Sequence, residues 1–302
     1  MKLCYKCHLP VEEAKMISGL HHDCFCQWFS VATPTEFQDV AAQSSSQENF
    51  QEKMWHQVNS SFFQGKFRKY SARIDHTHYL LKVEQKEFPE LPLVEYLCNQ
   101  LAELLGLEIP EYYMIRFQNR LDSFVSRNFM ANRPGSDLVH IYRYLNQPED
   151  YNCEHLLHII EKEVGRYNEI RRFVELCLFD ALIGNHDRHG RNLGLIKEKN
   201  KTSLAPFYDN PCYLAIETEE LLAAYHEPRG AIATTETKNP VMKDYVKEWM
   251  RLGFKEEIIQ FTNRINIQQI GKLISTSFLS KPRKEAIKKL CYRRYKELCD
   301  AI

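Results

Sequence analysis

One segment, residues 179–209, constrains the fold and chemistry of this chain more than any other. Apolar runs at 181–183 and 193–196 flank a polar stretch at 185–192, a pattern that predicts a helix end, a tight loop and a short strand. The polar stretch holds one carboxylate, two imidazoles, two guanidiniums and two carboxamides. A further short apolar segment then leads to Asp209. So many reactive groups in one loop indicate a catalytic or ligand-binding site.

The spacing of three oxygen-bearing side chains points to a particular chemistry. Four residues separate Asp187 from Asn192, and Asp209 follows seventeen positions later. A protein-kinase catalytic loop uses this order: an Asp orients the attacking hydroxyl and receives its proton, and an Asn and a second Asp bind Mg²⁺. In a solvated loop the first two residues would only cap a turn. Their combination with Asp209 favours phosphoryl transfer.

The two segments together resemble those of the HipA family of serine/threonine kinases, the toxins of bacterial toxin–antitoxin systems. That family has G-N-x-D-R-H-x-x-N in the loop and L-A-P-x-Y-D in the metal-binding segment, and both match here without gaps. The resemblance implies that Asp187 is the catalytic base and that Asn192 and Asp209 bind Mg²⁺. It also implies that Arg188 and His189 shape the loop and hold the phosphates of ATP.

The composition limits the function classes. Lys and Arg together number 40, as do Asp and Glu, so no bulk charge predicts binding to nucleic acid or to an anionic membrane. No apolar run is long enough to span a membrane, and the N-terminus lacks the apolar core of a secretory signal. Ten cysteines in such a chain indicate reduced thiols or a metal site rather than disulfides. We expect a cytoplasmic bacterial protein, or one that acts in the host cytosol if it is delivered as an effector.

Residues 1–30 differ from the rest because they are rich in Cys and His. Cys4 and Cys7 form a C-x-x-C pair, and His21 and Cys24 form an H-x-x-C pair, with thirteen residues between the two pairs. Zn²⁺ prefers four N or S ligands in a tetrahedron, which two such pairs can supply. A metal would also stabilise a segment too short to build a core of its own.

Two alternatives stay open for this segment. His22 or Cys26 can replace one of the four ligands, and the thiols can be a plain cluster or the first pair a redox couple. Similar pairs occur at the start of some short, stand-alone HipA-like kinases, the HipT branch. This resemblance favours His21 and Cys24 over their neighbours.

A turn or linker at 33–36 leads to a polar, glycine-free stretch at 41–55. Kinases cover the nucleotide phosphates with a flexible lid that is usually rich in glycine. The lid of the HipA family has the form S-x-[SG]-G-x-Q-x-K, and Ser46, Gln51 and Lys53 match its Ser, Gln and Lys. The resemblance therefore implies that this stretch covers the nucleotide.

The lid departs from the family pattern where Glu48 and Asn49 replace small residues. Asn tolerates the positive φ that glycine would provide, so the turn can form. The family autophosphorylates a lid serine, which implies phosphorylation of Ser46, with Ser44 and Ser45 as neighbouring alternatives. Glu48 already places a negative charge near this serine.

A lysine and a glutamate follow in the positions that a kinase needs. Residues 56–88 alternate and predict a β-hairpin or meander, with Lys82 in its second strand. Residues 91–107 have the spacing of a helix, which carries Glu95. Lys82 alone would be an ordinary edge charge; in a kinase it neutralises the nucleotide phosphates and pairs with a helix Glu. The family motif L-P-x-x-E-x₅-L-A-x₃-G-L implies these roles for Lys82 and Glu95.

Two further strands at 109–117 and 121–129 precede mainly helical sequence from residue 150. The basic helix at 281–299 is interpreted as a solvated surface rather than a nucleic-acid site. We predict an α+β, two-lobed, protein-kinase-like (HipA-like) fold whose lobes close over the nucleotide. Its parts are a zinc-binding segment at 1–30, a β-rich N-lobe with the nucleotide lid at 31–130, and a helical C-lobe with the catalytic loop at 131–302.

The resemblance implies an ATP- and Mg²⁺-dependent serine/threonine protein kinase of the HipA/HipT toxin type that autophosphorylates its lid. It implies a protein substrate that is a translation factor, such as an aminoacyl-tRNA synthetase. The partners it implies are a small HipS-like subunit and a DNA-binding HipB-like antitoxin.

Two other function classes stay open. A metal-dependent phosphohydrolase would bind its metal through His186 and Asp187, with His155 and His158 available upstream at helical spacing. A pseudokinase or zinc-stabilised binding module would account for a lid without glycine. The presence of all the kinase-type polar residues speaks against that second class.

Overall fold

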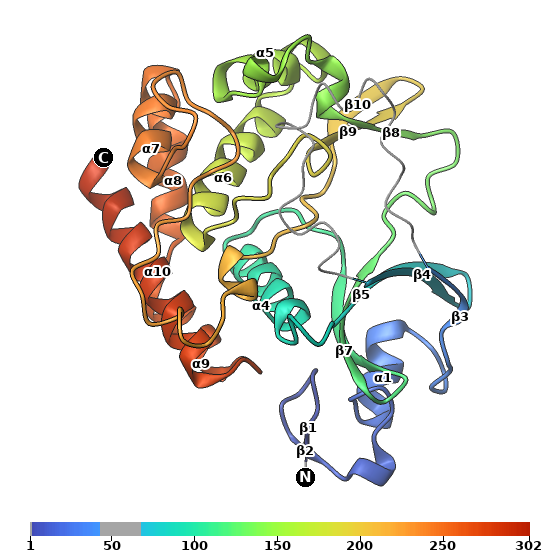
Figure 1. Cartoon of the computed structure of the whole chain (residues 1–302). Coiled ribbons are helices and arrows are strands. Elements are labelled where there is room, and N and C mark those ends of the chain that lie inside the picture. Colours follow the sequence, from blue (N-terminus) through green and yellow to red (C-terminus); the bar gives the residue numbers. More distant parts are fainter. Residues whose placement is uncertain (1, 43–67) are drawn as a thin grey trace.

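The computed structural model describes residues 2–42 and 68–302. A β-rich N-terminal region and a helical C-terminal region lie side by side (Figure 1). The predicted α+β class is therefore confirmed. Among the described residues, no helix has the length and apolar character needed to cross a membrane.

The N-terminal region is built on a five-stranded sheet in which every neighbouring pair is antiparallel. In spatial order its strands are β3 (Gln38–Ala42), β4 (Arg68–Ile74), β5 (Thr77–Val83), β7 (Leu121–Arg127) and β6 (Tyr112–Phe117). The predicted hairpin is β4–β5, and the predicted strand pair is β6–β7. The sequence did not predict β3. All its residues are exposed at the sheet edge, so it lacks the alternation that marks a half-buried strand.

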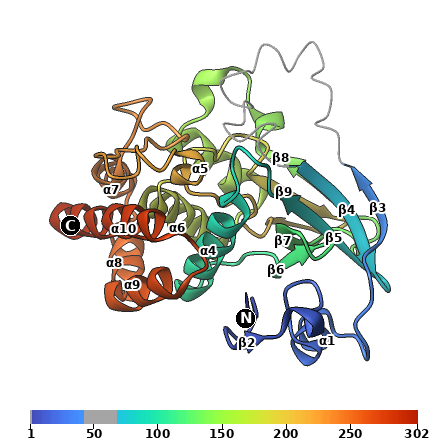
Figure 2. The ribbon, with the colours of Figure 1, turned by 60° about the horizontal axis from the view of Figure 1, so that its bottom comes forward.

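Helix α4 (Leu91–Leu104) lies between this sheet and the C-terminal helices (Figures 1 and 2). Pro92 sits in its first turn, where a missing N–H breaks no hydrogen bond. Because both neighbours cover it, most of the helix is buried, including the polar side chains of Glu95 and Asn99. Buried polar groups need partners, and both belong to the site described below.

The C-terminal region packs its helices around α6, which leads into the predicted catalytic loop at residues 184–192. Its core includes the edge-to-face contact of Phe173 with Trp249, whose ring centroids are 5.6 Å apart. A three-stranded antiparallel sheet, in the order β10-β9-β8, adjoins the loop. The elements are β8 (Asp137–His140), α5 (Cys153–Glu163), α6 (Tyr167–Ile183), β9 (Gly194–Glu198), β10 (Lys201–Leu204), α7 (Met242–Arg251), α8 (Lys255–Arg264), α9 (Ile267–Thr276) and α10 (Lys281–Ala301), with short 3₁₀ turns at Ile141–Tyr144, Pro148–Asp150 and Tyr213–Ile216.

The N-terminal segment forms a small unit beneath the five-stranded sheet (Figure 2). Phe29 packs against Tyr79 and Tyr113 of the sheet, with centroid distances of 5.6 and 4.9 Å. Tyr5 reaches Phe278 of the helical region at 4.8 Å, so this unit contacts both halves of the molecule. Its elements are β1 (Lys2–Leu3), β2 (Pro10–Val11), a 3₁₀ turn at Glu13–Lys15 and α1 (His22–Phe29).

Gly184 ends α6 and turns the chain into the catalytic loop. Its φ of 72° is in the left-handed region, and a Cβ here would lie 2.8 Å from side-chain carbons of Leu290 and Pro228. The position therefore needs glycine both for its backbone conformation and for the close approach of α10.

We expect Gly184→Ala to lower the free energy of unfolding by roughly 2–4 kcal/mol, since backbone strain adds to overpacking. Chemical denaturation measures this loss. Gly135→Ala is the matched control, because Gly135 has a φ of 74° but no neighbour within 4 Å of the added Cβ. Equal losses for the two variants would contradict the packing part of the explanation.

Candidate active site

Lys82 of β5 lies between two carboxylates that come from different parts of the chain. Its Nζ is 2.5 Å from Glu95 Oε1 of α4 and 2.5 Å from Asp209 Oδ1, in the segment after β10. Glu95 is fully buried, whereas the Asp209 side chain keeps 24% of its surface exposed. The sheet, α4 and the helical region thus meet at one ammonium group.

Charge–charge interactions at this centre outweigh the cost of burial for two of the three groups. Burial opposes the charge of Lys82, but Asp209 and Glu95 raise the pKa of Lys82 above its ordinary value. Burial also opposes ionisation of Asp209, but Lys82 and Lys69 hold the pKa of Asp209 well below its ordinary value. Burial raises the pKa of Glu95 despite its lysine partner. Asp209 is therefore an ionised oxygen donor at neutral pH.

Lys69 of β4 is a second cation at this centre that the sequence did not single out. It lies directly opposite Lys82 in the β4–β5 ladder, and its Nζ is 3.7 Å from Asp209 Oδ2. Like charges opposite each other are unfavourable, unless an anion lies between them. Only the strand register reveals this pairing, which explains why a reading of residue patterns missed it.

The catalytic loop is held by bonds between its own side chains and backbone. The Asn192 side-chain NH₂ donates to the Asp187 carbonyl at 2.9 Å, and the Asp187 N–H donates to Asn185 Oδ1 at 3.0 Å. All three residues are buried. The first bond turns the NH₂ end of Asn192 to the backbone, and its oxygen is the end that can ligate a cation.

Arg188 is the structural centre of the loop. Its five N–H groups donate to both oxygens of Asp180 at 2.8 and 2.9 Å, to the carbonyls of Asn192 and Tyr208 at 3.0 and 2.6 Å, and to Asn210 Oδ1 at 2.6 Å. A guanidinium has five such donors. This geometry suits the role of shaping the loop and leaves no N–H of Arg188 for nucleotide phosphates.

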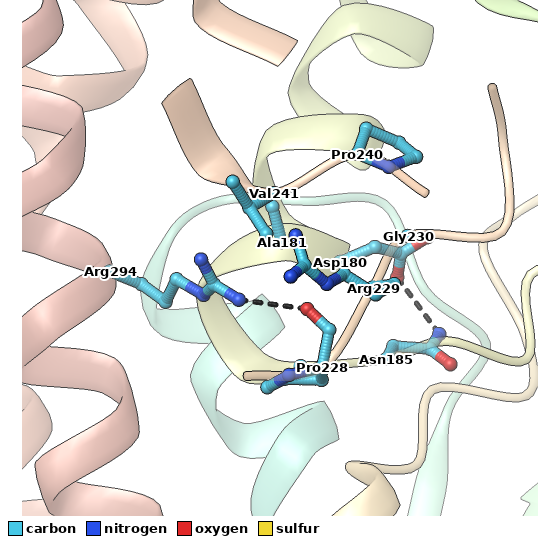
Figure 3. A pocket seen from close by; sticks show the side chains of 10 residues that line it. Asp180, Ala181, Asn185, Pro228, Arg229, Gly230, Pro240, Val241 and Arg294 are labelled. Carbon is cyan, nitrogen blue, oxygen red and sulfur yellow. Dashed lines mark hydrogen bonds between the residues drawn. The ribbon is translucent and has the colours of Figure 1, made fainter. Parts of the chain in front are cut away.

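Asp180, the bidentate partner of Arg188, also accepts a hydrogen bond from Asn185 Nδ2 at 2.9 Å. Asp180 and Asn185 line a narrow crevice behind the loop, where Arg294 of α10 donates to the Pro228 carbonyl at 2.8 Å (Figure 3). The crevice has no room for even a water-sized molecule, so it is not a ligand pocket. Behind the loop, Asp180 of α6 therefore supports Asn185 of the loop. Sequence reasoning missed Asp180 because it lies within the apolar stripe of α6.

His189 is buried and neutral at physiological pH. Burial lowers the pKa of its imidazole from 6.5 to about 4. Its Nδ1 accepts the Arg191 backbone N–H at 3.2 Å, so the ring proton lies on Nε2. The imidazole is therefore a fixed, uncharged part of the loop.

The predicted lid residues cannot be placed relative to the site. Ser44, Ser45, Ser46, Gln51 and Lys53, the predicted lid residues, lie outside the described residues.

The histidines of the alternative phosphohydrolase site do not assemble into a metal cluster in the described part of the chain. His155 and His158 lie on α5, and Nε2 of His155 is 4.0 Å from Asp150 Oδ2. The ring of His186 instead lies 5.4 Å from that of Tyr213.

The four predicted zinc ligands converge. One ligand atom from each of Cys4, Cys7, His21 and Cys24 lies within 4.8 Å of the others. Nδ1 of His21 is 3.3 Å from Cys7 Sγ and 3.9 Å from Cys24 Sγ, and its Nε2 is 3.1 Å from the Pro10 carbonyl. Such a carbonyl fixes the tautomer of a metal-ligating imidazole. The donor set suits tetrahedral Zn²⁺.

The two alternative ligands lie apart from this cluster. His22 Nδ1 and Cys26 Sγ face each other at 4.0 Å, and neither residue belongs to the four-residue group.

The depressed pKa of His189 makes stability depend on pH. The unfolded chain, with an imidazole pKa near 6.5, binds more protons than the folded chain between about pH 6.5 and 4. The free energy of unfolding should therefore fall by about 3 kcal/mol as the pH falls through this window. Urea denaturation of wild type and His189→Asn across the window isolates the effect, since the variant lacks this share of the slope. Parallel curves would contradict the prediction.

Comparison with known proteins shows the family of this chain. A family model of the HipA-like C-terminal domain matches residues 46–276, more than half of the chain. A candidate kinase of Haemophilus influenzae is 24% identical over 259 residues, 72% of this chain and 73% of that protein. The serine/threonine-protein kinase CtkA of Helicobacter pylori is 20% identical over 231 residues, 68% of this chain and 70% of that protein.

Two crystal structures share the fold. CtkA aligns with a TM-score of 0.65 and 18% identity, covering 77% of this chain and 92% of that chain. HipA of Shewanella oneidensis, in a complex with HipB and operator DNA, aligns with a TM-score of 0.55 and 16% identity, covering 74% of this chain and 60% of that chain. The chain belongs to the family with a HipA-like C-terminal domain and is homologous to serine/threonine protein kinases.

Proposed function

We propose that this protein is an ATP- and Mg²⁺-dependent serine/threonine protein kinase of the HipA/HipT type. The observation that carries the proposal is the contact of Lys82 with both Glu95 and Asp209. A lysine on a strand, a glutamate on the neighbouring helix and an aspartate that binds metal are the parts that a kinase brings together. Asp187 and Asn192 supply the remaining groups.

The side chains at the site suit Mg²⁺, the phosphates of ATP and the attacking hydroxyl. Asn192 and Asp209 offer hard oxygen atoms that suit Mg²⁺, which would neutralise phosphate charge when bound. Lys82 and Lys69 supply cations for the phosphates. Asp187 receives the proton of the attacking Ser or Thr hydroxyl, and Arg188 and neutral His189 hold the loop that presents it.

The lid and the substrate complete the proposal. We infer autophosphorylation of Ser46, or of its neighbours Ser44 and Ser45, which would pull the lid from the nucleotide. A translation factor such as an aminoacyl-tRNA synthetase is the protein substrate that the family resemblance supports. The HipB antitoxin in the Shewanella oneidensis complex supports a HipB-like partner, and the HipT resemblance supports a small HipS-like subunit.

We also propose that Cys4, Cys7, His21 and Cys24 bind a structural Zn²⁺. A closed set of four N and S ligands is typical of structural rather than catalytic zinc. The metal would hold β1, β2 and α1 together, a segment with few buried residues of its own. Tyr5 would then keep its contact with Phe278.

Asp187→Asn should lower phosphoryl transfer by about 10²–10⁴-fold, because an amide cannot take the proton of the attacking hydroxyl. Nucleotide affinity should stay unchanged. Incubation with γ-labelled ATP and Mg²⁺, followed by intact mass and peptide mapping, measures transfer, and we expect wild-type phosphate on the serines at 44–46. Asp137→Asn, at an exposed position on β8, is the matched control.

The two competing functions give different results in that experiment. A binding module would add no phosphate in wild type and would be indifferent to the substitution. A phosphohydrolase would bind a divalent metal without nucleotide and release inorganic phosphate. Release of inorganic phosphate, or no ATP binding at all, would overturn the kinase proposal. No added phosphate with ATP binding intact would overturn autophosphorylation of the lid and leave a pseudokinase or a kinase that acts only on its target.

The purified protein should contain one Zn²⁺ per chain, as measured by plasma mass spectrometry. Cys24→Ser should lose the metal and lower the melting temperature, because three ligands hold a structural Zn²⁺ poorly. Cys26→Ser is the control and should keep both. A metal-free wild type with reactive thiols at these positions would count against the site.

A further inference from the structure

Asn99 is a buried polar side chain that the kinase chemistry leaves unexplained. It lies one helical turn after Glu95 on α4 and is 3% exposed. Its Nδ2 donates to the Glu95 backbone carbonyl at 2.8 Å, and its Oδ1 accepts a hydrogen bond from Asn210 Nδ2 at 3.1 Å. The side chain thus joins α4 to the segment that follows Asp209.

Asn210 is fully buried and makes three hydrogen bonds. Besides Asn99, its Nδ2 donates to the Phe207 carbonyl at 2.9 Å, and its Oδ1 accepts from Arg188 Nη2 at 2.6 Å. The bond to Phe207 closes a turn around Asp209, whose φ is 54°. The bond to Arg188 reaches the catalytic loop.

The orientation of both carboxamides follows from their fixed partners. Arg188 can only donate, so the oxygen of Asn210 must face it, and the NH₂ group must face Asn99 and the Phe207 carbonyl. The Glu95 carbonyl can only accept, so the NH₂ group of Asn99 must face it and the oxygen must face Asn210. In each of these hydrogen bonds the donor and the acceptor are therefore fixed: Arg188 donates to Asn210, Asn210 to Asn99, and Asn99 to the Glu95 carbonyl.

These bonds close a circuit with the ionic centre. Glu95 is connected to Asp209 through its side chain by Lys82. The backbone carbonyl of Glu95 is also connected, through the side chain of Asn99, to Asn210, the residue after Asp209. The first connection uses the ammonium group that a kinase turns to the phosphates, and it uses the carboxylate that binds metal. The second connection uses neither.

We propose that Asn99 and Asn210 are positioning residues that form a second tether between α4 and the Asp209 segment. When nucleotide and Mg²⁺ bind, Lys82 turns to the phosphates and Asp209 to the metal, so their ion pair is lost. The tether then keeps the Asp209 carboxylate and the catalytic loop in a fixed position relative to Glu95. This inference rests on the proposed kinase function. Because the tether consists of neutral groups that are buried, nucleotide charge and solvent do not compete for it.

A double-mutant cycle on the full chain tests the tether. Asn99→Ala should lower kcat about tenfold and Asn210→Ala about a hundredfold, the larger loss reflecting the additional contact with Arg188. The double variant should lose no more than Asn210→Ala alone, because both changes break the same connection. Both single variants should also need more Mg²⁺ for half-maximal activity, while their affinity for ADP without Mg²⁺ stays that of wild type.

Two controls separate positioning from loss of stability. Asn266→Ala removes the cap of α9, where the side chain accepts the Gln268 and Gln269 N–H groups, and it should lower the melting temperature but leave kcat and the Mg²⁺ requirement unchanged. Asn99→Leu fills the volume of the carboxamide and serves if Asn99→Ala folds poorly. It should show the tenfold loss of kcat and the raised Mg²⁺ requirement expected for Asn99→Ala.

The outcomes distinguish the tether from the function on which it rests. An active wild type with additive losses in the double variant, or with an unchanged Mg²⁺ requirement, would overturn the tether alone. A wild type that transfers no phosphate and binds no nucleotide would overturn the kinase proposal and the tether with it. Coupled losses with a raised Mg²⁺ requirement would support both.

Discussion

A single buried ammonium group, that of Lys82, sets the conditions for the rest of the structure. A charge in a protein interior is unfavourable unless opposite charges and hydrogen bonds compensate it. Here Glu95 and Asp209 compensate it at 2.5 Å each. The compensation requires β5, α4 and the segment after β10 to meet at one point. The apolar neighbours Leu81 and Val83 on β5 are buried and hold the lysine strand in place, so the core and the ionic centre depend on each other.

Lys82 joins the two regions of the molecule. A second buried ion pair, Arg188 with Asp180, holds the catalytic loop against α6. It converts a polar loop into a rigid one, because each N–H of the guanidinium has an acceptor. Asn210 connects the two centres, since it accepts from Arg188 and donates to Asn99 on α4. The groups proposed for proton transfer and metal binding are thus held by residues that take no part in the chemistry, which is how preorganised sites are built.

Much of this was predictable from residue patterns, and the reasons for the exceptions are physical. The loop motif, Lys82 on a strand and Glu95 on a helix follow from spacing, because short motifs and local periodicity are encoded within a few residues. The four predicted zinc ligands also converge. Their paired spacing indicated a metal site, and the HipT resemblance favoured His21 and Cys24 over their neighbours. Lys69, Asn99, Asp180 and Asn210 were not predicted as site residues. Their roles depend on strand register and on contacts between segments far apart in sequence, and no local pattern distinguishes a buried Asn from a solvated one.

If the protein is a kinase, the Asp209 carboxylate beside Lys82 binds nucleotide through Mg²⁺. Isothermal titration of ADP into the wild-type protein and Asp209→Asn, each with and without Mg²⁺, tests it most directly. We predict that Mg²⁺ strengthens ADP binding to wild type at least tenfold, a gain of about 1.4 kcal/mol, and that Asp209→Asn loses this gain while retaining Mg²⁺-free binding. Equal affinities with and without Mg²⁺ in wild type, or no ADP binding at all, would contradict the account.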